Sequence, residues 1–136
     1  MTLWFADTSV VVPAIVSSHE HHDRVNHAIG RRVVRLPWHA SLEAYSVLSR
    51  LPGDARLSPA DAVLVLSERF GEAVVLADVD AKLLVGQLAQ LRIAGGAVYD
   101  ALIAMTATKA GGTLLTRDRR AASTYEQLKA AHQFVG

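Results

Sequence analysis

The sequence contains no cysteine among its 136 residues. This absence excludes disulfide bonds, a thiolate nucleophile and any metal site built on cysteine ligands. It is also typical of proteins kept in a reducing compartment. The start of the chain has no basic segment leading into an apolar signal sequence. Both features predict a cytoplasmic protein.

Long apolar runs are missing as well, although apolar residues make up 51% of the chain. No run approaches the roughly 20 residues that a membrane-spanning helix needs, so we expect no membrane partner. Apolar residues spread over a chain of this length predict one domain with a substantial core, covering 1–136.

Excess charge of one sign is also lacking, since the formal net charge is +1. A dedicated nucleic-acid-binding domain is usually far more basic. Local arginine clusters are present, however, and one of them consists of Arg117, Arg119 and Arg120 around Asp118. Guanidinium groups bind phosphate well, but arginines are also common at solvent-exposed helix ends. The cluster alone does not distinguish a phosphate-binding site from an ordinary exposed helix end.

Short apolar runs alternate with segments of helical periodicity along the whole chain. The runs predict strands at 2–6, 33–36, 73–76, 113–116 and 133–135, and the periodic segments predict helices at 9–16, 19–29, 38–51, 58–70, 80–91, 97–109 and 120–131. In the third helix, Trp38, Leu42, Tyr45, Leu48 and Leu51 form the expected buried stripe. Continuous apolar strands separated by helices predict a three-layer α/β/α sandwich with a central parallel sheet of four to five strands.

Four carboxylates stand at boundaries of these predicted elements. Asp7 ends the first strand, Glu43 lies one turn into a helix, Asp100 lies in the first turn of another, and Asp118 follows the fourth strand. Parallel sheets bind ligands at the carboxyl ends of their strands, so neighbouring first and fourth strands would bring Asp7 and Asp118 together. Four such acids together predict a Mg²⁺ site, because Mg²⁺ prefers oxygen ligands.

Each acid also has a purely structural interpretation. Asp7 suits a helix N-cap, Glu43 a surface ion pair with Arg50, Asp100 the dipole of its helix, and Asp118 a turn. Their joint placement favours the shared metal site.

The motifs around these acids resemble those of the PIN-domain family, and in length the chain resembles the toxin ribonucleases of VapBC toxin–antitoxin pairs. The motifs are, in order, Leu-Trp-Phe-Ala-Asp7-Thr-Ser, Ser-Leu-Glu43, Tyr-Asp100-Ala-Leu-Ile-Ala and Leu-Leu-Thr116-Arg-Asp118. The resemblance extends over about residues 3 to 135.

This resemblance implies an endoribonuclease dependent on Mg²⁺ or Mn²⁺, in which metal-activated water attacks the RNA phosphate. Asp7, Glu43, Asp100 and Asp118 would be its catalytic residues and metal ligands. Supporting hydroxyls would come from Ser9 and Thr116, and RNA-binding guanidinium groups from Arg117, Arg119 and Arg120. A VapB-type antitoxin and a second copy of the chain are the implied protein partners.

One departure from the family concerns the number of metal ions. Many relatives carry a further acid shortly after the fourth motif, where this chain has Arg119-Arg120-Ala121-Ala122. A first metal is therefore expected, and a second is left open.

Two alternative functions remain at this point: a metal-dependent phosphatase, and a PIN-like module that binds nucleic acid without catalysis. Against the phosphatase, Asp7-Thr8-Ser9 lacks the second acid two residues after the first. Against the inactive module, all four acids are present.

Overall fold

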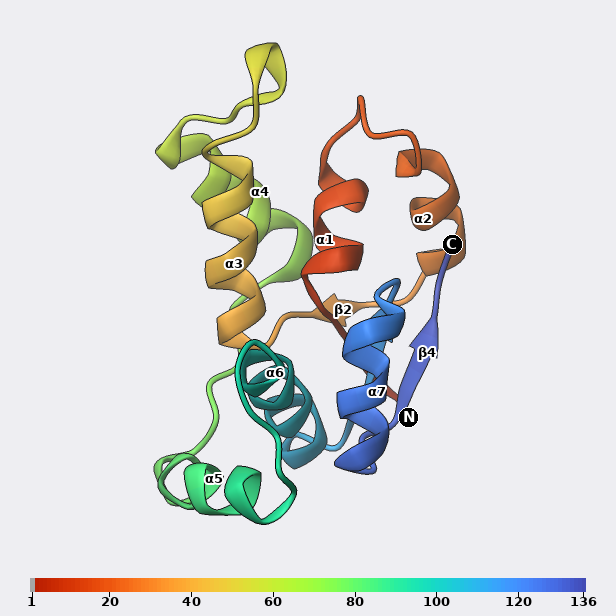
Figure 1. The fold of residues 1–136 in the computed structure, drawn as a ribbon. Coiled ribbons are helices and arrows are strands. Elements are labelled where there is room, and N and C mark those ends of the chain that lie inside the picture. Colours follow the sequence, from red (N-terminus) through yellow and green to blue (C-terminus); the bar gives the residue numbers. More distant parts are fainter. Residues whose placement is uncertain (1) are drawn as a thin grey trace.

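A computed structural model describes residues 2–136 (Figure 1). Its strands are β1 (Leu3–Ala6), β2 (Val34–Arg35), β3 (Gly112–Thr116) and β4 (His132–Phe134). Its α-helices are α1 (Thr8–Ile15), α2 (His22–Ile29), α3 (Trp38–Leu48), α4 (Pro59–Phe70), α5 (Asp78–Gln90), α6 (Ala97–Lys109) and α7 (Arg119–Gln127), with a 3₁₀ turn η1 (Gly53–Ala55) after α3. Within residues 2–136, none of these helices has the length and apolar character required to cross a membrane.

The four strands form one parallel sheet in the order β2-β1-β3-β4. The chain first moves outward from β1 to β2 and then returns to place β3 on the other side of β1. The strand order therefore reverses between β1 and β3, which are paired from Leu3 with Gly112 to Ala6 with Leu115. Open parallel sheets form their ligand sites beside the carboxyl ends of such strands.

Helices cover both faces of the sheet, because successive side chains of a strand point to opposite faces. Ala6 and Leu115 pack with α1, α2, α3 and α4 on one face. Phe5 and Leu114 pack with α6 and α7 on the other. Figure 1 shows α5 at the end of the molecule beside α6, against which it packs. The predicted three-layer sandwich with a parallel sheet is confirmed.

One predicted strand is wrong. Residues 73–76 contribute a single bridge between Val74 and Pro37, with Val74 donating to Leu36 and accepting from Trp38. Proline has no N–H for a ladder, and β2 is itself only two residues long, so this pairing cannot extend. The remaining helices and strands occur close to their predicted places, but α2 begins at His22 rather than His19, and α3 and α7 end three or four residues early.

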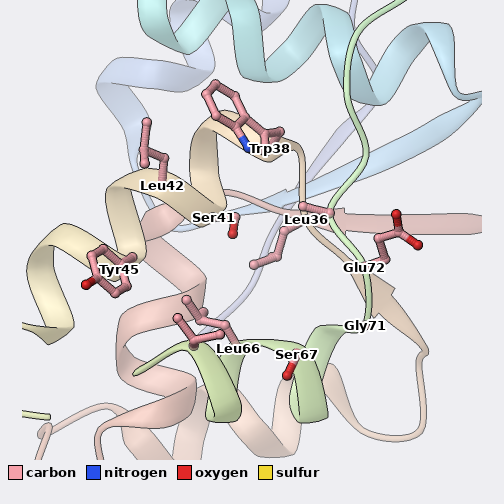
Figure 2. A pocket seen from close by; sticks show the side chains of 11 residues that line it. Leu36, Trp38, Ser41, Leu42, Tyr45, Leu66, Ser67, Gly71 and Glu72 are labelled. Atoms are coloured by element: carbon pink, nitrogen blue, oxygen red, sulfur yellow. The ribbon is translucent and has the colours of Figure 1, made fainter. Parts of the chain in front are cut away.

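The predicted buried stripe of α3 is also wrong in part. Trp38 and Leu42 are each 49% exposed, whereas Ala40, Ala44 and Leu48 are fully buried. Small alanines let α3 lie close to its neighbours, and the two larger side chains are directed into a groove instead. Figure 2 shows this groove between α3 and α4, with Trp38, Leu42 and Tyr45 along one wall and Leu66 on the other.

Candidate active site

The first and last of the four acids meet at the reversal point of the sheet. Asp7 follows β1 and Asp118 follows β3, and these two strands are neighbours. A backbone hydrogen bond from Asp7 N to the Leu115 carbonyl, at 3.1 Å, extends the ladder to Asp7 itself. The strands that carry Asp7 and Asp118 are therefore neighbours, which is the condition for the two acids to share one edge of the sheet.

Asp7 is the most constrained of the acids, with only 4% of its surface exposed. Its Oδ1 accepts hydrogen bonds from Ser9 N at 3.1 Å and from Ser9 Oγ at 2.5 Å. Its Oδ2 accepts from Thr116 Oγ1 at 2.5 Å and from Tyr125 Oη at 2.7 Å. These four donors occupy all the usual acceptor positions of a carboxylate. Burial raises the pKa of Asp7, and the hydrogen bonds from Ser9, Thr116 and Tyr125 oppose that rise.

The backbone fixes the direction of the two hydroxyl hydrogen bonds. Ser9 Oγ accepts from Arg117 N at 2.8 Å, and Thr116 Oγ1 accepts from Asp118 N at 3.1 Å. Because each hydroxyl already accepts from an N–H, its own hydrogen is available for the Asp7 carboxylate. The chain after β3 is thereby tied to the chain after β1, and Asp7 is held in one orientation.

Asp100, near the start of α6, is the partly exposed acid of the cluster whose pKa is clearly raised. Desolvation, followed by the charges of Asp118, Asp7 and Glu43, raises its pKa to about 6, while Arg120 opposes the rise. Within residues 2–136, no hydrogen bond to its carboxylate is found, in contrast to Asp7. The raised pKa places the four acids in one electrostatic neighbourhood, with Asp100 exposed to the repulsion of the others.

Glu43 reaches the cluster from α3. Its Oε1 accepts a hydrogen bond from Thr8 Oγ1 at 3.1 Å, and its Oε2 lies 3.8 Å from His39 Nε2 one helical turn earlier. The alternative ion pair with Arg50 is not formed, since Arg50 instead donates to Ser46 Oγ. Glu43 is therefore directed toward the residue that follows Asp7.

Asp118 has one structural role where it stands, which it fulfils with two hydrogen bonds. It is the N-cap of α7, and its Oδ1 accepts from Arg120 N at 2.9 Å and from Ala121 N at 3.2 Å. The arginines around it line a pocket together with Thr8, Ser9 and His19. Arg119 lies over the Phe134 ring, with its guanidinium carbon 4.6 Å from the ring centre. The predicted arginine cluster thus borders the acids.

The donor set suits a hard divalent cation, although the acids do not form a closed shell. Among residues 2–136, no three histidine, aspartate or glutamate side chains lie close enough together to form a ready-made metal site. Asp7 is buried and held by four hydrogen bonds, whereas Glu43, Asp100 and Asp118 are partly exposed. All donors are carboxylate oxygens, the ligands that Mg²⁺ and Mn²⁺ prefer. A cation between them would also relieve the repulsion felt by Asp100.

Tyr125 is a member of this site that sequence reasoning missed. It is fully buried on α7, and burial together with the charge of Asp7 raises its pKa, so the phenol stays protonated and donates. The spacing of Ala121, Ala122 and Tyr125 indicates a buried face on this helix. A buried tyrosine hydroxyl usually has a hydrogen-bond partner, so a tyrosine on this buried face predicts a polar group beside it.

The groove between α3 and α4 is separate from this chemistry. Its walls are largely apolar, and Figure 2 shows Glu72 as the acid at its border, with none of the four clustered acids among the labelled residues. Of the α4 residues that line the groove, Leu66 is buried and Val63 is 59% exposed. The groove has no cluster of titratable groups with which to perform catalysis.

Sequence comparison finds a match to the PIN domain family over residues 4–127. The chain is 46% identical over 122 residues to ribonuclease VapC27 of Mycobacterium tuberculosis, covering 90% of this chain and 89% of that protein. It is 40% identical over 130 residues to ribonuclease VapC40 of the same species, covering 95% and 96%.

Comparison with solved structures finds the same fold at low sequence identity. FitAcB from Neisseria gonorrhoeae matches with a TM-score of 0.72 at 18% identity, covering 96% of both chains. VapBC2 from Rickettsia felis, bound to a DNA fragment from its promoter, matches with a TM-score of 0.68 at 14% identity, covering 98% of both chains. At this identity the likeness concerns the fold alone.

Proposed function

The chain belongs to the PIN-domain family, and on that basis we propose that it is a metal-dependent endoribonuclease, the VapC-type toxin of a VapBC toxin–antitoxin pair. Its 46% identity to a named ribonuclease over nine-tenths of the chain supports the reaction class. The observation that carries the proposal is geometric: Asp7 and Asp118 follow neighbouring strands at the reversal point of the sheet. The raised pKa of Asp100, to which Asp118, Asp7 and Glu43 contribute after desolvation, supports it.

In this proposal Asp7, Glu43, Asp100 and Asp118 hold one Mg²⁺ or Mn²⁺ ion. When bound, such an ion lowers the pKa of water and neutralises charge on a phosphate. Asp7 accepts four hydrogen bonds, so binding at Asp7 requires one of these donors to be displaced. Asp100 has no such competitor within residues 2–136, and it contributes its charge once deprotonated.

The other residues position groups and attract the substrate. Ser9 and Thr116 fix the Asp7 carboxylate through their hydroxyls. Arg117, Arg119 and Arg120 attract the phosphates that flank the attacked bond, since RNA-binding proteins depend strongly on backbone charge. Phosphodiester hydrolysis needs a bound cation and positive groups that hold the phosphate, and in this proposal the acids bind the cation and the arginines bind the phosphate.

The partners that follow from this proposal are an RNA substrate, a cognate VapB-type antitoxin and a second copy of the chain, in the cytoplasm. The support for them is the family and the named relatives. A second bound metal is not proposed, since Arg119 and Arg120 stand where many relatives have a further acid.

The experiment that tests the function is cleavage of single-stranded RNA by the purified wild-type chain, with Asp100→Asn as the matched inactive control. Cleavage should stop in EDTA and return with Mg²⁺ or Mn²⁺. Cleavage that persists in chelator, or in the Asp100→Asn protein, would contradict the proposed site. Hydrolysis of a phosphate monoester without RNA cleavage would instead identify the phosphatase alternative.

A second test is expression in cells. Wild-type chain expressed without an antitoxin should arrest growth, and Asp100→Asn at the same level should not. Equal toxicity of the two proteins would show that growth arrest does not depend on this site.

A further inference from the structure

A pair of stacked aromatic rings lies beside the carboxylate cluster, and the proposed mechanism does not use it. The rings of His39 on α3 and Tyr99 on α6 lie 5.2 Å apart between centroids and are nearly parallel, with 10° between their planes. Tyr99 directly precedes Asp100 in the chain, and His39 lies beside Glu43. The pair therefore stands next to two of the four acids.

This pair is held in place by a chain of contacts that begins at the site itself. Thr8, next to Asp7, donates to Glu43 Oε1, and Glu43 Oε2 lies 3.8 Å from His39 Nε2. The His39 side chain is only 17% exposed and supports one face of the Tyr99 ring. His39 thus supports the Tyr99 ring before any ligand arrives, which lowers the entropy lost on binding.

The tyrosine itself remains open to solvent. Tyr99 is 54% exposed even though His39 covers one face of its ring. A large aromatic side chain left exposed beside a catalytic cluster presents a second face to whatever binds there. Unpaired bases stack on such faces, because every base has a flat π surface, and RNA is read in this way where it is single-stranded.

We propose that the Tyr99 ring, backed by His39, is the binding platform for an unpaired RNA base next to the attacked phosphate. This inference rests on the proposed ribonuclease function and specifies its substrate as single-stranded at that nucleotide. The platform binds the base through its ring and not through its hydroxyl. It contributes to substrate binding alike before and during the reaction, and so mainly to KM.

The test uses an RNA oligonucleotide spanning a site that the wild-type chain itself cuts. Two further oligonucleotides carry an abasic ribose on one or the other side of the cut phosphate. The wild type should lose about tenfold in kcat/KM on one abasic substrate, as expected for one stacked base. Tyr99→Leu should lose about as much on the intact RNA, mainly through KM, and should lose little more on that abasic RNA.

Two control variants separate stacking from other effects. Tyr99→Phe keeps the ring and should match the wild type. Trp38→Leu removes an exposed aromatic ring from the groove between α3 and α4 and should also match it. The proposal is overturned if Tyr99→Leu cuts intact RNA as the wild type does. It is equally overturned if the losses from the variant and the abasic substrate simply multiply. Failure of the wild type to cut any RNA with Mg²⁺ would refute the proposed function instead.

Discussion

Replacing Asp100 with asparagine should stabilise the metal-free protein. The Asp100 carboxylate has a pKa of about 6, raised from 3.8 by desolvation and by Asp118, Asp7 and Glu43. In the unfolded chain these influences vanish. Above pH 6 the folded protein therefore carries a charge that its own structure disfavours, and the asparagine amide removes that charge with little change of shape.

The size of the effect follows from the shift. A difference of about two pH units corresponds to about 3 kcal/mol at about 1.4 kcal/mol per unit. Asp100 is only partly buried, and solvent screens part of the repulsion, so we expect about 1 kcal/mol. For a chain of this size that corresponds to a rise of about 4 °C in Tm.

The pH dependence has a definite sign. Well below pH 3.8 the carboxyl is protonated in both the folded and the unfolded chain, so variant and wild type should be equally stable. As pH rises from about 4 to 6, the unfolded chain releases its proton first and the wild type loses stability relative to the variant. Above about pH 6 the difference becomes constant.

The assay is thermal unfolding of both proteins in EDTA and in Mg²⁺ across this pH range. In EDTA above pH 6 the variant should have the higher Tm. In Mg²⁺ the wild type should gain stability and the variant should gain less, because it lacks a charged ligand. An Asp100→Asn protein no more stable than the wild type in EDTA, or an advantage that persists undiminished at about pH 3, would refute the claim that burial and the neighbouring acids perturb Asp100.

Three other variants test the remaining parts of the site. Asp118→Ala removes the cap of α7 and should lose about 1 kcal/mol of stability, whereas Asp118→Asn should keep most of that stability. Both variants should be inactive, and RNA cleavage by Asp118→Asn would show that Asp118 is not a metal ligand. Tyr125→Phe should lower the free energy of unfolding, measured in urea, by about 1–2 kcal/mol, because Asp7 Oδ2 loses a buried hydrogen-bond donor. An unchanged urea midpoint would argue against that hydrogen bond. Arg119→Ala should reduce the slope of log(kcat/KM) against log[salt] by about 0.7, the value for one phosphate contact with single-stranded RNA, and an equal slope would place Arg119 outside the RNA path.

The placement of the acids was predictable because it depends on topology more than on detail. Asp7 and Asp118 each follow an apolar strand, and a parallel sheet brings the ends of neighbouring strands to the same edge. The strands β1 and β3 are far apart in sequence, and the usual reversal of strand order is enough to make them neighbours. Strand ends are a robust feature of the sequence pattern.

Helix faces and single bridges were less predictable. The apolar stripe of α3 suggested that Trp38 and Leu42 are buried, but close packing selected Ala40 and Ala44 instead. Hydrophobicity does not distinguish a small side chain that permits close approach from a large one that fills space. The predicted strand at 73–76 is wrong because a strand depends on its partner, and within residues 2–136 its bridge partner is Pro37, which has no N–H to extend the pairing.

The contrast between Asp7 and Asp100 explains why the second is the better probe of the site. Asp7 accepts four hydrogen bonds, and two of its donors are hydroxyls that already accept from backbone N–H groups. An asparagine at position 7 would point its N–H groups at other hydrogen-bond donors, and these hydroxyls cannot become acceptors because they already accept from the backbone. Substitution of Asp7 would therefore change the stability of the fold as well as the metal site. Asp100 has the same charge and the same neighbours in electrostatic terms, without that network. A change at Asp100 therefore reports on its burial and on the charge of the cluster, without breaking a hydrogen bond that the fold depends on.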